Sequence, residues 1–370
     1  MLRRKLKVKA KAHPDYLIMT CLALLVVFGL TMLASASSNL GKIKFDDTYY
    51  YLKHQLIYGL IPGALGFFFL SRIYYRSYEK FAVVFLIVSI VLLSLVFTPL
   101  GVTAKGANRW LSFGPITFQP GEIVKITFIL YLAAWLSKGK ERQKNFLRGF
   151  LPFVLIIGSL AALLLGQPAT STAAILIGTA LIIYFMSGAR WLYVLGFGLV
   201  GALIFLSLIY TTPYRWERIK AFLDPNSNIQ TTGYHLNQAR IAIGSGGLTG
   251  VGFGKSTTKI SYLPEPVGDS IFAIIAEEFG FIGASVMATL FLFLILRIFL
   301  LSRKTADGFA RLILIGFGTL IAFQVFIHIG AISGLLPLTG TPLPFVSYGG
   351  TALAVFMSMG GIAVNISKYV

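Results

Sequence analysis

The sequence predicts an all-α polytopic membrane protein with about ten transmembrane helices and one long extracytoplasmic loop. Of its 370 residues, 56% are hydrophobic and only 12% are charged, whereas soluble domains carry charge on about a quarter of their positions. The mean hydropathy is +0.80. A chain this apolar cannot cover its surface with polar groups, so a soluble enzyme, a secreted disulfide scaffold and a disordered protein are excluded. The single cysteine, Cys21, excludes an internal disulfide and a metal site built on cysteines.

The expected helices follow from apolar runs, since a membrane-spanning helix needs about 20 mostly apolar residues. The sixth run is short, and the eighth and ninth are long enough to tilt or to extend beyond the bilayer. The first run has a basic start and small residues near its end, as in a secretory signal. It is longer than a signal core and further spans follow, so a retained helix is favoured. The ten runs lie near residues 15–36, 54–71, 80–98, 121–137, 149–166, 172–187, 191–211, 270–300, 309–335 and 349–367.

The basic residues predict the orientation of these spans. Of the 32 Lys and Arg residues, 20 lie on the side that holds both termini and 12 lie on the other side. By the positive-inside rule both termini are cytoplasmic. No internal repeat and no separate soluble domain is visible, so residues 1–370 are expected to form a single transmembrane domain in the bacterial cytoplasmic membrane.

The longest segment on the opposite side covers residues 212–269 and is far longer than a plain connector. Loops of this length are usually functional or disordered. Residues 214–225 are typical of a short amphipathic helix stopped by Pro225, and residues 235–247 of a second helix that ends in glycines. Such helices would lie in the membrane interface or re-enter the membrane.

A first polar cluster lies at the mouth of the fourth span. Glu122 and Lys125 are three residues apart, so on a helix they share a face and can pair. One interpretation is a snorkelling interfacial cluster with a Trp anchor. The other is a cationic pocket for an anionic headgroup, with Arg109 suited to bidentate phosphate contacts. The members of the cluster are Arg109, Trp110, Gln119, Glu122 and Lys125.

A second cluster lies where the long loop enters the eighth span, and its residue of interest is Asp269. At 100° per residue Glu277 is about 80° from Asp269 on a helix and Glu278 is on the opposite face, so Glu277 is expected to share a cavity with Asp269. Asp269 is suited to capping the helix start. That role does not explain three acidic residues in one span, and a partly desolvated carboxylate there can accept a proton from a hydroxyl.

Two glycine-rich segments complete the candidate regions. Residues 334–351 contain Ser347 and Tyr348 and are expected to form either a cavity wall or re-entrant segment, or a rigid turn without a ligand. Residues 244–256 have spacing like a nucleotide-binding loop. Such a loop needs a buried strand before it and a helix after it, so nucleotide binding is disfavoured. The four histidines show no metal-ligand spacing.

Together these segments resemble the SEDS family of cell-wall glycan polymerases, the FtsW and RodA proteins. The resemblance runs from residue 35 to residue 350, and several independent motifs occur in order. The spacing of GKSTTKISYLPEP is closer to the division-type FtsW branch. The motifs are GANRW and FQPGE, AFLDP at 221–225, GYHLNQARIAIGSGG at 233–247, YLPEPVGD followed by AEEFGFIGA, and PLPFVSYGG at 342–350.

The resemblance implies a peptidoglycan glycosyltransferase that polymerises lipid II, a disaccharide-pentapeptide on undecaprenyl pyrophosphate, in cell division or cell-shape maintenance. It implies a class B penicillin-binding protein and other divisome or elongasome membrane proteins as partners. The position that matches the catalytic carboxylate is Asp269. The expected substrate-binding residues are Arg109, Glu122, Lys125, Gln238, Glu277 and Ser347.

In this hypothesis the reaction occurs at the outer face of the membrane and inverts the configuration at C1 of the donor sugar, with Asp269 as general base. The leaving lipid pyrophosphate needs charge neutralisation, for which Arg109 and Lys125 are suited. Glu122 would orient Lys125 or hold a divalent cation such as Mg²⁺ or Mn²⁺, and no other cofactor is expected.

Three features depart from the family pattern. Val267 and Gly268 replace a usual His-Thr before the Asp, an acidic residue is missing from GQPATST at 166–172, and His328 replaces a common Asn. The alternative functions are a lipid II flippase or transporter that uses the same polar cavity, and a structural scaffold. A transporter often shows inverted repeats and a site at the bilayer midplane. Here the polar residues crowd one face.

Overall fold

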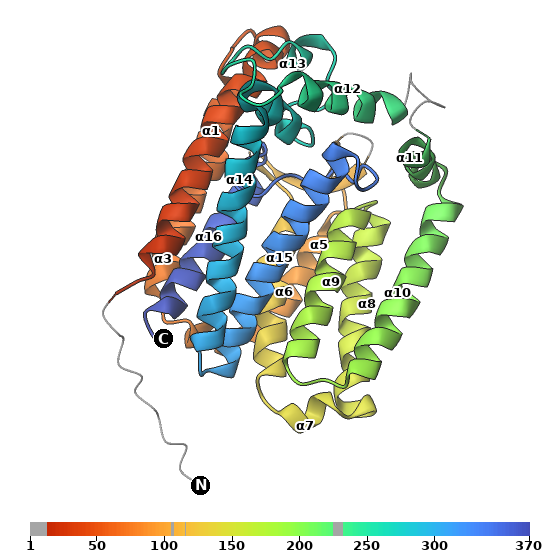
Figure 1. Ribbon diagram of the computed structural model, residues 1–370. Helices are drawn as coiled ribbons and strands as arrows, with labels where there is room; N and C mark the ends of the chain where they lie inside the picture. Colours follow the sequence, from red (N-terminus) through yellow and green to blue (C-terminus); the bar gives the residue numbers. More distant parts are fainter. Residues whose placement is uncertain (1–12, 105–106, 115, 225–231) are drawn as a thin grey trace.

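The computed structural model describes residues 13–104, 107–114, 116–224 and 232–370. Long helices form a bundle, and shorter elements lie across one end of it, opposite the end where the chain terminates (Figure 1). We call these shorter elements, with the segments that join them, the capping layer. It contains β1 Gly101–Ala104, β2 Ala107–Phe113, β3 Ile116–Phe118, α11 Pro213–Leu223, α12 Thr232–Ser245 and α13 Thr258–Ser261.

Ten helical segments of the described residues coincide with the ten spans that the sequence predicts. They are α1 Tyr16–Phe45; α2 Tyr50–Gln55, which continues through the π-helical turn η1 Leu56–Leu60 into α3 Ile61–Arg72; α5 Ala82–Leu95; α6 Pro120–Leu136; the π-helical turn η2 Phe146–Phe150 with α8 Leu151–Gly166; α9 Thr170–Met186; α10 Trp191–Thr211; α14 Ile271–Lys304; α15 Gly308–Ser333; and α16 Gly350–Ser367. The short helices α4 Arg76–Lys80 and α7 Lys140–Gln143 lie in the connections at the end away from the capping layer.

Seven of these segments are long and apolar enough, by length and composition, to cross a membrane. The others are shorter: α5 has 14 residues, and α6 and α9 have 17 each. The centre of the bundle contains α15 and α16, most of whose residues are buried, whereas α10 has no buried residue. An apolar helix exposed all round is stable only in contact with lipid. The chain is therefore a multi-pass membrane protein, and α10 lies at its lipid-facing edge (Figure 1).

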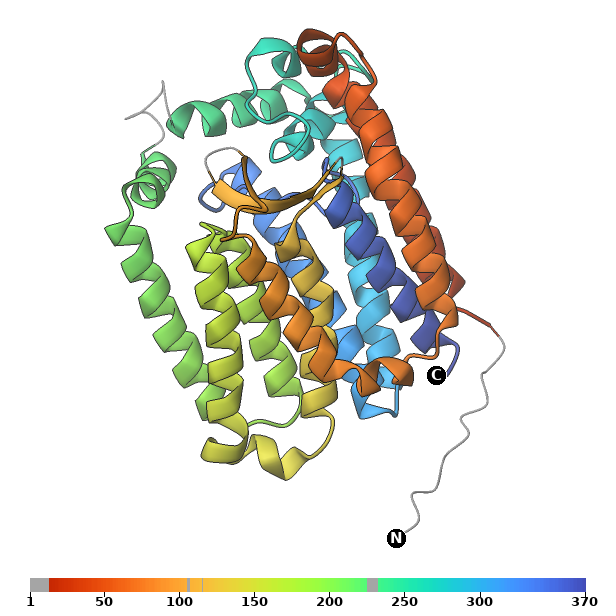
Figure 2. The same cartoon turned by 180° about the vertical axis from the view of Figure 1, so that it is seen from behind.

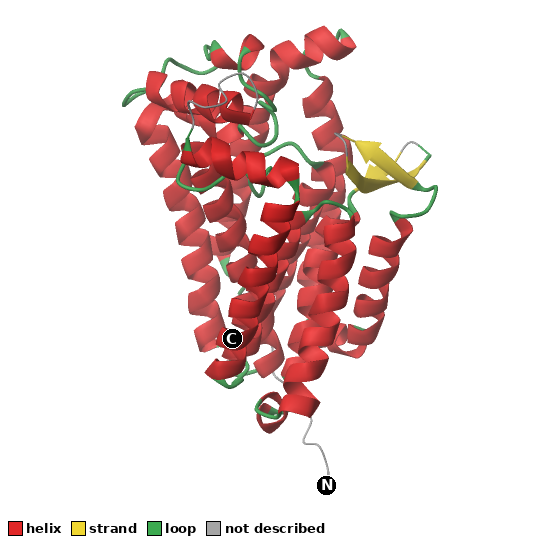
Figure 3. Cartoon of the chain, turned by 90° about the vertical axis from the view of Figure 1, so that its right-hand side faces the viewer, coloured by secondary structure: helices red, strands yellow, loops and turns green. Residues whose placement is uncertain are grey.

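The capping layer contains a sheet that was not predicted from the sequence, because its strands have only 4, 7 and 3 residues. β1, β2 and β3 form an antiparallel sheet in that order, with Leu111 opposite Phe118 (Figure 3). Its residues are rich in β-branched and aromatic types, which favour strands. The sheet lies above the ends of α5 and α6 and carries Arg109 on its middle strand (Figure 2).

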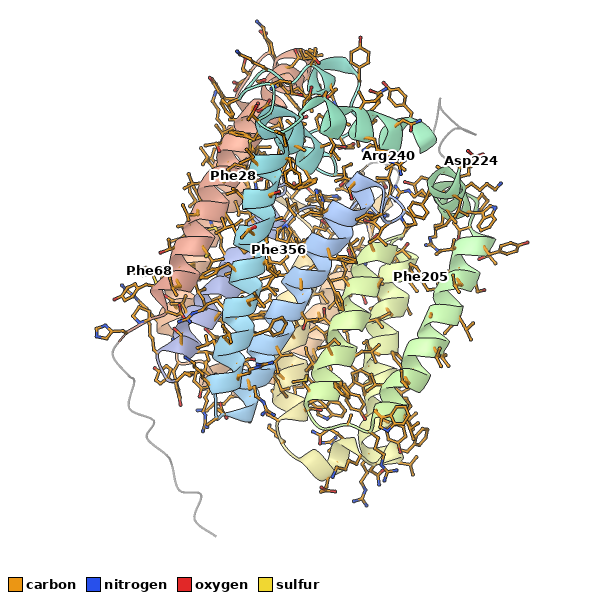
Figure 4. All side chains as sticks on the ribbon, viewed as in Figure 1. Phe28, Phe68, Phe205, Asp224, Arg240 and Phe356 are labelled. Carbon is orange, nitrogen blue, oxygen red and sulfur yellow. The ribbon has the colours of Figure 1, made fainter. Side chains whose placement is uncertain are left out.

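The two amphipathic helices predicted in the long loop are confirmed as α11 and α12. α11 ends at Leu223, while the predicted helix stop, Pro225, lies outside the described residues. α12 ends at Ser245 before two glycines, as predicted. Arg240 of α12 donates a hydrogen bond of 3.4 Å to the Gly334 carbonyl at the end of α15, so the helix lies over the bundle (Figure 4).

The glycine-rich segment 244–256 has a structural role at a break in α14. Gly280 has φ of 65° and ψ of −165°, which interrupts the helix and separates its first turns from the rest. The loop crosses this break closely: a Cβ on Gly280 would lie 2.4 Å from the Gly250 nitrogen. Only glycine tolerates both this backbone conformation and this approach.

Backbone hydrogen bonds from the loop replace those that the helix loses at the break. Val251 and Gly252 donate to the carbonyls of Glu277 and Glu278 at 2.9 and 3.0 Å. In return, the amides of Phe281 and Ile282 donate to the carbonyls of residues 247 and 248 at 2.9 and 3.1 Å. Interrupted helices are tolerated in membranes where protein satisfies the freed backbone groups. The segment therefore supplies the backbone hydrogen bonds that α14 lacks at Gly280.

Candidate functional site

Asp269 lies in the capping layer, in the non-helical stretch that precedes α14. The N-cap position of α14 is Ser270, and no side chain caps the first turn. Asp269 is half-buried and lines a small cavity with residues of α11, α12 and α15. Asp269 therefore does not cap α14, and the capping role considered for it is wrong.

The loop between α15 and α16 holds the backbone around Asp269. The Ser347 hydroxyl donates to the Gly268 carbonyl at 2.8 Å and accepts from the Leu343 amide at 2.8 Å. The Tyr348 amide donates to the Val267 carbonyl at 2.8 Å. Ser347 is buried and is absent from the lining of both cavities below, so it positions the Asp269 backbone. Its predicted contact with substrate stays untested.

Two adjoining cavities lie at this point of the fold. The smaller, of about 30 Å³, is lined by Asp269 and by residues 338–341 of the glycine-rich segment 334–351. The larger, of about 300 Å³, lies between α11 and α12 and reaches the lower end of the size range of ligand pockets. Arg218, His235 and Leu338 line both. The expectation that segment 334–351 forms a cavity wall is confirmed.

The structure adds two histidines to the site, and neither was among the predicted site residues. His235 of α12 donates from Nε2 to Ser270 at 2.7 Å, because the Ser270 hydroxyl itself donates to Pro264 at 2.6 Å. Burial lowers the pKa of His235, and the nearby Asp269 carboxylate opposes that shift. His328 of α15 lines the smaller cavity. The two lie 93 positions apart in the chain, so no local spacing indicates that they converge.

Arg218 is the third residue that sequence analysis missed. It donates from Nη1 to the Leu338 carbonyl at 3.0 Å, and its guanidinium lies 4.5 Å from the centre of the Tyr214 ring, whose hydroxyl also accepts a hydrogen bond from it. These contacts hold a cation at the wall shared by the two cavities. The sequence signal that could have identified Arg218 is its position on the predicted amphipathic helix.

The charges of Asp269 and Arg218 act on Arg109 of β2. It donates to the carbonyls of Gln167 and Pro168, the former at 3.1 Å, which leaves Nη1 without a hydrogen bond among the described residues. Burial lowers the pKa of Arg109, while the negative charge of Asp269 raises it and the cation of Arg218 lowers it. Arg109 does not line either cavity, and its predicted contact with substrate stays untested.

The predicted pair of Glu122 and Lys125 forms, but deeper than expected. The Lys125 ammonium lies 2.7 Å from Glu122 and 2.9 Å from Gln324, and 5.5 Å from the centre of the Phe356 ring inside the bundle (Figure 4). Glu122 and Lys125 are each 2% exposed, so the pair does not snorkel to the surface. Gln324 donates to the Pro342 carbonyl at 2.8 Å. Glu122 and Lys125 do not line either cavity. They support the segment that forms the cavity wall through Gln324.

The expectation that Glu277 shares a cavity with Asp269 is wrong. Glu277 is buried and accepts hydrogen bonds from the hydroxyls of Ser256 and Thr258 and from two loop amides. The helical-wheel argument fails because α14 begins at Ile271, so Asp269 is not on the helix from which the angle was counted.

Glu278 also holds the capping layer in place. It forms a buried ion pair with Lys259 at 2.6 Å and accepts from Ser35 of α1 at 2.6 Å. Gln238, a further predicted site residue, is partly exposed on α12 and does not line either cavity. No group of three or more His, Cys, Asp and Glu residues in the described part of the chain is arranged to hold a metal ion.

Comparisons with known proteins agree on one family. The model of the FtsW, RodA and SpoVE family, described as "Cell cycle protein", matches residues 15–370. The chain is 36% identical to stage V sporulation protein E of Bacillus subtilis, over 97% of this chain and 98% of that protein. It is 37% identical to a probable peptidoglycan glycosyltransferase FtsW of Geobacter sp. strain M18, over 95% and 96% of the two chains.

A solved structure has the same fold. It is described as showing structural coordination of polymerization and crosslinking by a peptidoglycan synthase complex. Its matching chain is 26% identical, with a TM-score of 0.79 over 96% of this chain and 98% of that chain.

The buried pair generates a prediction about stability. Lys125→Met leaves Glu122 buried without its cation and is expected to lower the free energy of unfolding by about 3–5 kcal/mol. Adding Glu122→Gln removes the stranded charge and should recover most of that loss. Thermal unfolding of the purified protein in detergent measures both. The exposed Lys144, paired with Glu141, provides the control Lys144→Met, expected to change stability by less than about 0.5 kcal/mol. A double variant as unstable as Lys125→Met would contradict the pairing argument.

Proposed function

The chain belongs to the FtsW, RodA and SpoVE family, and from this premise we infer that it is a peptidoglycan glycosyltransferase of cell division or cell-shape maintenance. The substrate we propose is lipid II, whose polymerisation would occur at the cavities beside Asp269. The observation that carries this proposal is a half-buried carboxylate that faces a cavity beside an arginine, at one end of a membrane bundle.

The proposed reaction is a single displacement. Asp269 takes the proton of the attacking hydroxyl of the acceptor sugar as that oxygen bonds to C1 of the donor sugar. The bond from C1 to the pyrophosphate oxygen breaks, and the lipid pyrophosphate leaves with the electron pair. Among the described residues that line the two cavities, Asp269 is the one carboxylate. It lines the smaller cavity, and a single base suits inversion at C1.

The cations near the cavities supply charge stabilisation. Arg218 lines both cavities, and Arg109 interacts electrostatically with both Arg218 and Asp269. We propose that these two guanidinium groups hold the pyrophosphate, since guanidinium matches phosphate oxygens in charge and geometry. Lys125 and Glu122 then act on the reaction through Gln324 and the cavity wall.

The expected divalent cation stays a prediction. Glu122, the residue suggested to hold it, already accepts from the Lys125 ammonium, which does not suit a metal ligand. No step of the proposed mechanism passes through a metal.

We further propose that both termini are cytoplasmic and that the capping layer is extracytoplasmic, where lipid II carries its disaccharide. The proposed partner is a class B penicillin-binding protein that crosslinks the glycan, in line with the synthase complex that the fold resembles.

The central prediction concerns Asp269. Asp269→Asn keeps the size of the side chain but removes the base, and loss of a general base costs about 10²–10⁴-fold in rate. The purified variant should keep its thermal stability and its binding to the penicillin-binding protein, yet form no glycan from lipid II that is detectable on a gel. The control is Asp46→Asn, because Asp46 is an exposed carboxylate in a left-handed conformation that asparagine tolerates.

Glycan formation by Asp269→Asn at a normal rate would remove Asp269 from the mechanism. The alternative of a flippase gives a different result. In that case the variant would lose movement of lipid II across vesicle membranes, and the wild-type protein would make no glycan.

A second prediction concerns orientation. With Cys21 replaced by serine, a cysteine at the exposed position Leu248 of the capping layer should react with an impermeant maleimide on intact spheroplasts. A cysteine at Lys138, exposed at the other end of the bundle, should react only after lysis. The reverse pattern would place the proposed site in the cytoplasm and contradict the orientation.

A further inference from the structure

His328 presents an unusual combination of contacts at the cavity beside Asp269. Its side chain is 2% exposed, and Nδ1 lies 2.6 Å from the Thr341 carbonyl oxygen. Its other nitrogen, Nε2, is buried and has no hydrogen-bond partner among the described residues. His328 and Asp269 line the same small cavity.

The hydrogen bond to Thr341 assigns the proton of the ring. A carbonyl oxygen only accepts, so Nδ1 carries the hydrogen, and in the neutral imidazole Nε2 then holds the lone pair. A buried acceptor without a donor is unfavourable, and such atoms are rare in native structures. The geometry therefore requires a donor that arrives from outside the described side chains.

No described group supplies this donor, since Nε2 has no hydrogen-bond partner within the described residues. Arg218 donates to Leu338 and Tyr214, His235 donates to Ser270, and the hydroxyls of Thr339 and Thr341 share a hydrogen bond of 3.1 Å with each other. Asp269 forms no ion pair with His328 in the part of the chain that the structure describes. The small cavity thus contains two acceptors from different elements, a carboxylate and an imidazole lone pair, and it adjoins a cavity about ten times as large.

We propose that Nε2 of His328 binds the hydroxyl next to the attacking hydroxyl on the acceptor sugar. This inference rests on the proposed function. The attacking hydroxyl has one hydrogen, which it gives to Asp269, so it has none left for His328. The neighbouring hydroxyl has its own hydrogen. Two acceptors at one cavity match two adjacent donors on one ring edge, while the ring itself occupies the larger cavity.

In this role His328 determines which acceptor is used and how it is oriented. Orientation of a bound reactant can contribute strongly to rate, because the attacking oxygen must point at the donor carbon. A site built to bind a hydroxyl also discriminates against a sugar that lacks it, since the acceptor nitrogen is then left unpaired.

The experiment compares two acceptors and three proteins. The normal acceptor is lipid II, and the other is a synthetic lipid II in which hydrogen replaces the hydroxyl beside the attacking one. The wild-type protein should use the deoxy acceptor with kcat/KM lowered about tenfold. His328→Asn retains an amide that can donate to Thr341 but lacks an atom at the Nε2 position.

With His328→Asn, we expect kcat/KM for lipid II to fall about tenfold and the two acceptors to differ by less than about twofold. His328→Gln can place its amide oxygen near the position of Nε2, so it should restore part of the discrimination. A role limited to holding Thr341, or a trapped water in the cavity, predicts instead that His328→Asn keeps the full tenfold preference. That result would overturn the proposal.

Thr319→Val is the control for burial of an unpartnered polar atom. Thr319 is on the same helix, and its hydroxyl oxygen also has no partner among the described residues, but it does not line either cavity. It should leave both rates and their ratio unchanged. A wild-type protein that makes no glycan from ordinary lipid II would contradict the proposed function itself, and this inference with it.

Discussion

The break in α14 at Gly280 is the constraint on which the rest of the capping layer depends. A membrane helix that loses its hydrogen bonds must find other partners, and here the loop of residues 246–252 supplies them on both sides of the break. Because the loop lies so close to the helix backbone, the approach needs glycines at Gly250 and Gly280. The same contact fixes where the first turns of α14 lie, and hence where the chain before them, with Asp269, enters the bundle.

The buried charges divide into two kinds. Glu277, Glu278 and Glu122 are each bonded to side chains of this chain: hydroxyls of the loop, Lys259 and Lys125. Charges buried in this way are expensive unless paired, and their pairing ties the capping layer and the cavity wall to the helices. Asp269 differs, since it lines a cavity that it shares with the cation of Arg218. A carboxylate left available in this way is suited to chemistry, whereas the paired ones are suited to holding the fold.

The sequence predicted the helices well, because each span is long and apolar enough to be recognised without knowledge of its neighbours. It also predicted the pairing of Glu122 with Lys125, which depends only on spacing along one helix. The sheet of residues 101–118 was missed, since its strands are short and lie next to spans with a stronger signal. The assignment of Glu277 failed because it assumed a helix before Ile271, and the helix start depends on the tertiary contacts of the loop.

The convergence of His235, His328 and Arg218 on Asp269 could not be predicted, because three separate elements meet there only after folding.

The most direct test of the account is to ask whether substrate enters the cavities beside Asp269. A photoreactive amino acid at Leu338, which lines both cavities, should crosslink to lipid II when illuminated, and excess unlabelled lipid II should suppress the crosslink. The same group at Phe205, on the lipid-facing α10, should not crosslink to the disaccharide. Equal crosslinking at both positions, or none at Leu338, would contradict the claim that the cavities beside Asp269 receive the glycan.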